Sequence, residues 1–100
     1  MLYGANGYIT KDVGSKVVTV MLKNNLLNYM QEISFLLKSY AKQAKLDADH
    51  PKEGDSSDFN DGFLMAYHQV ITTMKNQAPF FDLMIEDLNL SDIDPDKDLI

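Results

Sequence analysis

The chain has 100 residues, of which 45% are hydrophobic and 24% charged, as is typical of one globular domain. It contains no cysteine, which excludes disulfide bonds and cysteine-ligated zinc. The net charge of −6 is uneven, because residues 1–46 carry six lysines against two acids and residues 47–100 carry three lysines against thirteen acids. Arginine, the usual residue for reading bases and clamping phosphates, is absent. We therefore expect the two halves to neutralise each other and no nucleic acid to bind.

The N-terminal residues show neither the basic region nor the apolar region of a signal peptide. No apolar run approaches the roughly 18 residues that a membrane-spanning helix needs. These features predict a cytoplasmic protein that does not contact a membrane.

Residues 1–14 are predicted to form an irregular arm, because they hold three glycines and the turn dipeptide Asn6-Gly7. We expect the arm to dock through its large apolar side chains, which are Leu2, Tyr3, Tyr8 and Ile9. A short β-hairpin that pairs residues 8–10 with residues 17–20 is the alternative, since the second segment is rich in β-branched residues. The helical pattern that follows favours helix for residues 17–20.

Residues 15–46 are predicted to form one helix, around which the rest of the chain is organised. Ser15 is a suitable N-cap. The apolar residues recur at steps of three and four, which places them on one helical face: Leu22, Leu26, Tyr29, Ile33, Leu36, Leu37, Tyr40 and Ala44. Such a helix is about 50 Å long, which is long for a chain of this size.

A polar loop is expected over residues 47–57, and a second helix over residues 58–90, with Ser57 or Asp58 as its N-cap. Pro79 removes one helical hydrogen bond and clashes with the preceding turn. Two outcomes are open: one helix kinked at Pro79, or a break followed by a third helix. The apolar stripe keeps its phase past Pro79, which favours the kinked helix. The acidic tail, residues 91–100, is expected to be extended or frayed.

These elements predict an all-α fold, a long antiparallel helical hairpin whose arms have similar lengths. Ion pairs such as Lys45 with Asp58 and Lys42 with Asp61 would select this register. The apolar residues exceed what one seam can bury; the surplus is Leu27, Met30, Leu37, Met65, Ile71, Phe80 and Ile85. We therefore expect two hairpins to associate as a homodimeric four-helix bundle.

Candidate metal and catalytic sites are weak. Asp92, Asp94 and Asp96 match the start of a calcium loop, but Lys97 stands where that loop requires glycine. His68 has no histidine or carboxylate one turn away, and His50 lies in the loop, so neither is expected to bind metal or transfer protons. No nucleophile motif or phosphate loop is present. We expect no enzyme activity, no catalytic residue, no cofactor and no metal.

Methionine and phenylalanine are plentiful in the helices, and most of them fall on the apolar stripe, which predicts core packing. Met65 and Phe80 are the exceptions, and they are candidates for a surface that binds a partner. The leading hypothesis is a small non-enzymatic interaction or regulatory protein that dimerises and binds an unidentified protein.

Two other functions stay open. One is a small-ligand-binding or catalytic bundle with a pocket near Tyr67, His68 and Met74, which requires His68 to point inward toward a polar partner. The other is an acidic mimic of nucleic acid that acts as an inhibitor. It requires the acids to form a continuous exposed stripe.

Overall fold

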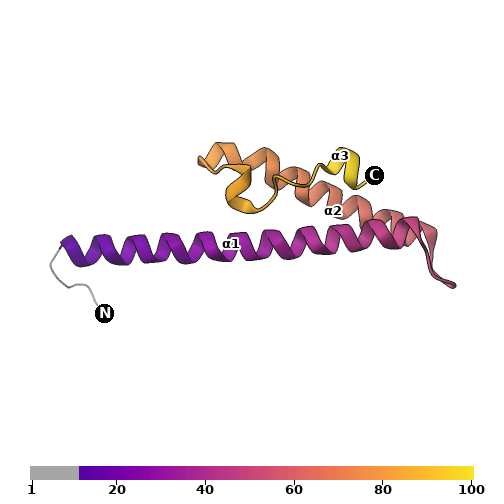
Figure 1. Ribbon diagram of the computed structural model, residues 1–100, viewed down its shortest axis with the longest axis horizontal. Coiled ribbons are helices and arrows are strands. Elements are labelled where there is room, and N and C mark those ends of the chain that lie inside the picture. Colours follow the sequence, from indigo (N-terminus) through magenta and orange to yellow (C-terminus); the bar gives the residue numbers. More distant parts are fainter. Residues whose placement is uncertain (1–11) are drawn as a thin grey trace. The chain divides into compact units, whose positions relative to one another are not determined.

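The computed structural model describes the backbone of residues 12–100 and the side chains from Lys16 onward. Its elements are α1 (Asp12–Asp49), α2 (Ser57–Gln77), the 3₁₀ helices η1 (Ala78–Phe81) and η2 (Ile85–Leu88), and α3 (Pro95–Asp98) (Figure 1). The prediction of an all-α protein is confirmed over this range. None of the described helices combines the length and apolarity needed to cross a membrane.

Helix α1 is longer at both ends than the predicted helix over residues 15–46. Ser15 lies inside it and is therefore not the N-cap. Residues 17–20 are helical, so the alternative β-hairpin is wrong. The weak strand preference of a few β-branched residues is overridden by the helix in which they lie. The predicted arm lies outside the described residues, except that residues 12–14 are helical.

The chain divides into two compact units between Met30 and Gln31. In the first unit, the described part of α1 keeps most of its large apolar side chains exposed, and Leu27 is half-buried. Leu22, Leu26 and Tyr29, which were predicted to be core, are 57%, 64% and 62% exposed. The predicted stripe is therefore present on the helix, but these three positions are not buried.

The second unit contains the hydrophobic core, which joins residues of α1, α2 and the C-terminal segment: Ala41, Ala44, Leu64, Ile71, Ala78, Leu88, Leu90, Ile93 and Leu99. On α1 the buried positions include Ser34, Lys38 and Ala41, whereas Tyr40 of the predicted stripe is half exposed. The C-terminal segment contacts this face of α1, since Asn89 and Asp92 both accept hydrogen bonds from Lys38. The buried face of α1 is therefore turned about the helix axis relative to the predicted apolar stripe, which carries the bulkiest side chains.

Helix α2 is capped one residue before the predicted position, because the Ser56 hydroxyl accepts a hydrogen bond from the Phe59 backbone N–H at 3.2 Å. Within the second unit, α2 contacts α1 in the antiparallel direction. Asn60 Nδ2 donates to the Asp47 carbonyl oxygen at 3.2 Å, and the rings of Tyr40 and Tyr67 lie 6.4 Å apart.

The predicted helical arms are not matched, since α2 has 21 residues and α1 has 38. The predicted pairing of Lys45 with Asp58 is replaced by an ion pair with Asp49, at 3.0 Å on α1 itself.

The prediction of one kinked helix through Pro79 is wrong, because α2 ends at Gln77 and the chain tightens into η1. Pro79 has no N–H with which to continue the helix. Asp82 then adopts a left-handed conformation (φ 58°) and donates its N–H to the Pro79 carbonyl, which turns the chain back. The apolar pattern that continues at helical spacing past Pro79 does not mark a buried helix face, since Phe81 and Met84 are exposed.

The acidic tail is not frayed. Leu90, Ile93 and Leu99 are at most 2% exposed and belong to the core. Asp94 caps α3 by accepting a hydrogen bond from the Asp96 N–H, and Asp98 accepts one from the Asp94 N–H at 2.8 Å. Asp94 and Asp98 are therefore capping groups, and the apolar residues hold the segment on the core.

Candidate functional site

A groove of about 750 Å³ runs along α2 in the second unit, and we call it the α2 groove. One wall comes from α2, where Leu64, Met65, His68 and Thr72 recur at helical spacing. The other wall is made by Leu99 and Ile100, which follow α3. The exposed surface of the groove as a whole is mainly apolar, and a volume of this size lies in the range of about 300–1,000 Å³ that is usual for ligand sites.

The walls of the α2 groove are held in place by polar contacts. Lys45 Nζ on α1 donates to the backbone carbonyl oxygen of Ile100. His68 Nε2 lies 3.0 Å from Asp96 Oδ1, which joins α2 to α3. These contacts position the C-terminal residues beside α2, so the groove depends on how the tail folds.

In the pair formed by His68 and Asp96, the aspartate is the exposed member. The Asp96 side chain is 86% exposed, and that of His68 is 26% exposed. A catalytic dyad needs a buried carboxylate that fixes the imidazole, as in serine hydrolases. This exposed pair is better suited to holding α3 on α2, and its energy is small because water screens it.

The α2 groove is lined by one of the three residues, Tyr67, His68 and Met74, near which a pocket was predicted. Tyr67 and Met74 pack against the hydrophobic core, and His68 alone of the three lines the groove. His68 does have a polar partner, as that hypothesis required, but the partner lies on α3 at the surface. The sequence could not reveal this groove because its second wall belongs to the tail that was expected to be frayed.

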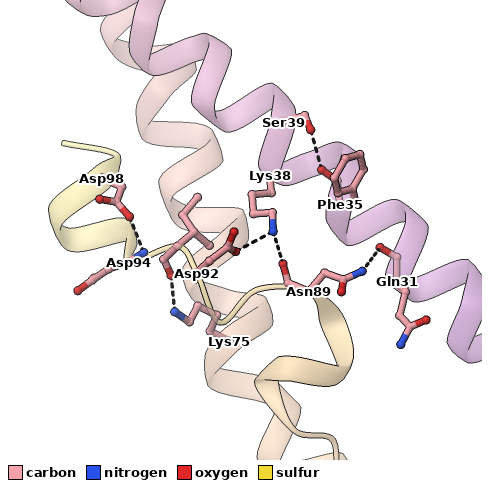
Figure 2. Close-up of polar contacts among 10 residues, drawn as sticks. Gln31, Phe35, Lys38, Ser39, Lys75, Asn89, Asp92, Asp94 and Asp98 are labelled. Carbon is pink, nitrogen blue, oxygen red and sulfur yellow. Dashed lines mark hydrogen bonds and ion pairs between the residues drawn. The ribbon is translucent and has the colours of Figure 1, made fainter.

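A second polar cluster holds the C-terminal segment against α1 (Figure 2). Lys38 Nζ donates to the Asn89 carbonyl oxygen at 2.6 Å and to Asp92 Oδ1 at 2.7 Å. Asn89 Nδ2 donates in turn to the Gln31 carbonyl oxygen at 3.3 Å. The Lys38 side chain is only 9% exposed, so its ammonium group is almost removed from water. The hydrogen bonds that this ammonium group donates therefore hold the C-terminal segment on α1.

No family model, curated protein or solved structure matches this chain. Its function is therefore inferred from its own surfaces and contacts.

The three aspartates that match the start of a calcium loop do not converge on one site, because each makes a different contact. Asp92 pairs with Lys38, Asp94 caps α3 and Asp96 pairs with His68. In the part of the chain that the structure describes, no group of three or more histidine or acidic residues is placed to hold a metal ion. The sequence signal that could have revealed the Lys38 cluster is a lysine within an apolar stretch, between Leu37 and Ala41, combined with acids in the tail.

The hydrogen bond from Lys38 lowers the pKa of Asp92 below its ordinary value of 3.8. Because the folded-state pKa is depressed, this contact stabilises the protein above pH 3.8, and the stabilisation is lost as the pH falls from there through the folded pKa. We expect the Asp92→Asn variant to show a shallower fall of the unfolding free energy with acidification below pH 3.8. Urea unfolding monitored by circular dichroism at several pH values measures this slope.

The background variant Lys38→Met provides the control for this pH dependence. Adding Asp92→Asn to Lys38→Met should leave the slope unchanged, because the cation that perturbs Asp92 is already gone. Equal slopes in the wild type and in Asp92→Asn would show that the pair does not couple folding to pH.

Proposed function

We propose that this chain is a small helical interaction protein that self-associates through an apolar face of α1. This α1 apolar face consists of Val18, Leu22, Leu26 and Tyr29, which recur at helical spacing. The observation that carries the proposal is that all four side chains are exposed by between 55% and 64%. A contiguous apolar surface of this kind is typical of a protein interface.

The available area is sufficient for a stable interface. The exposed side chains of Met21 and Met30 border this face, one on each side of it. If each of these six exposed side chains contributes roughly 100 Å², together they offer roughly 600 Å², the lower end of the area per partner in a specific interface. Asn24 lies on the opposite side of the helix from this face, and Asn28 lies outside the face.

Charge favours a second copy of the chain as the partner. Residues 1–30 carry three lysines against one acid, whereas residues 31–100 carry six lysines against fourteen acids. Two identical chains can therefore place a basic segment of one against an acidic segment of the other, which speeds and orients association. The resulting homodimer would combine α1 and α2 of two copies in a four-helix arrangement.

The role that we propose for the dimer is non-enzymatic and cytoplasmic: it binds another protein in an accessory or regulatory capacity. Exposed aromatic side chains elsewhere on the second unit support this role, because Phe59, Phe80 and Phe81 are 66%, 80% and 69% exposed. Phe59 stacks on Phe63 at a centroid distance of 5.7 Å, which gives that surface a fixed aromatic geometry.

Light scattering coupled to size exclusion, run at several concentrations, tests the proposal. We expect the wild type to be a dimer and Leu22→Glu/Leu26→Glu to be a monomer, because two buried charges would lack partners in the interface. The control Asn24→Glu/Asn28→Glu adds the same charge outside the α1 apolar face and should remain a dimer. A wild type that is monomeric at every concentration would contradict self-association.

A further inference from the structure

We infer that the α2 groove is the docking site for the α1 apolar face of a second copy of the chain. This inference rests on the self-association proposed above and identifies the surface that receives the helix. Each chain of the dimer would then offer one helix and one groove.

The two surfaces match in length. The α2 wall of the groove extends from Asp61 to Thr73, a rise of about 18 Å at 1.5 Å per residue. The exposed stretch of α1 between Lys16 and Met30 has a rise of about 21 Å. An amphipathic helix that lays its apolar face into such a groove is a common mode of recognition.

The two surfaces also match in chemistry. The α2 wall presents Met65, which is 69% exposed, and the opposite wall presents Ile100, which is 70% exposed. Leu22 and Leu26 are branched apolar side chains of the kind that such a groove can bury. Methionine is unbranched and adapts its shape to the side chain that it meets.

The charges at the edges are complementary. Lys16 and Lys23 are seven residues apart, so they lie on the same side of α1 and flank its apolar face. The groove is bordered by Asp61 and, through its contact with His68, by Asp96. A helix seated in the groove therefore brings its lysines toward carboxylates. Packing two α1 apolar faces against each other would instead bring two basic segments together.

The absence of cysteine makes a direct test possible, since an introduced thiol is the only one in its chain. A ¹⁵N-labelled Leu26→Cys chain is mixed with an unlabelled Met65→Cys chain and treated with a short bismaleimide cross-linker. We expect mass spectrometry to show a covalent dimer that contains one chain of each kind. The control pair, Asn24→Cys with Met65→Cys, should give at most about one tenth of that product, because Asn24 lies on the opposite face.

Two further measurements separate this inference from self-association itself. The Met65→Glu variant, altered at an exposed position, should weaken dimerisation by roughly tenfold or more in light scattering, because a charge enters the groove. A Met65→Glu chain that dimerises like the wild type would overturn the inference. So would cross-linking of Leu26→Cys chains only with each other, which would leave self-association standing with α1 packed on α1. A monomeric wild type would overturn both proposals.

Discussion

The substitution Ile71→Ala is expected to lower the free energy of unfolding by about 3 kcal/mol, within the usual range of 2–5 kcal/mol for a fully buried isoleucine. Ile71 is 0% exposed and belongs to the core cluster of the second unit. Truncation removes three methyl or methylene groups and leaves a cavity that the surrounding helices can fill only in part. Urea unfolding monitored by circular dichroism gives the free energy and shows, through the slope, whether unfolding stays two-state.

The neighbouring Val70 provides the control. Val70 is 40% exposed on the same helix, so Val70→Ala removes fewer buried atoms and also improves helix propensity. We expect its effect to be within about 0.5 kcal/mol, as for most surface positions. Equal effects at the two positions would show that Ile71 is not a core residue and would restore the prediction that it belongs to an association surface.

The substitution Lys38→Met is expected to lower the free energy of unfolding by about 2 kcal/mol, because charged hydrogen bonds contribute about 1.5–3 kcal/mol each and methionine retains the apolar stem. The loss leaves the Asn89 carbonyl without the donor that now lies 2.6 Å away. The Asp92 carboxylate is 61% exposed and can return to water, so the carbonyl accounts for most of the effect. Urea unfolding measures the change.

Lys42, one turn further along α1 and exposed, is the matched control, and Lys42→Met should alter stability by less than about 0.5 kcal/mol. Hydrogen exchange adds a local measurement, since faster exchange of residues 88–93 is expected in Lys38→Met. A variant as stable as the wild type would mean that burying the ammonium group costs as much as its hydrogen bonds contribute.

The helices were predictable because their signals are local. The three-and-four spacing from Leu22 to Ala44 predicts α1, and Pro79 marks the point near which α2 ends. The error at Pro79 came from giving more weight to a repeating apolar pattern than to the missing N–H. An apolar residue can keep helical phase and still be exposed, as Phe81 is.

The α2 groove was not predictable from the sequence, and the signal for the Lys38 cluster was limited to a lysine within an apolar stretch and acids in the tail. Both depend on the C-terminal segment, whose acids indicated a solvated tail, whereas Leu90, Ile93 and Leu99 are buried. Contacts between residues more than 50 positions apart, such as Lys38 with Asn89 and Asp92, leave no periodic signal. The contact between His68 and Asp96 was missed for the same reason, since Asp96 reaches it from α3.

The sequence by itself determined that this protein is all-α, where its first helix runs, and that its apolar residues outnumber what its core buries. These properties follow from spacing and composition, which act between near neighbours. Only the tertiary structure decided which face of α1 is buried, because the hydrogen bonds of Lys38 with Asn89 and Asp92 hold the C-terminal segment on that face. It also decided that the tail closes one side of the α2 groove. This wall forms only when the buried apolar side chains of the tail pack on the core and the buried Lys38 binds the C-terminal segment.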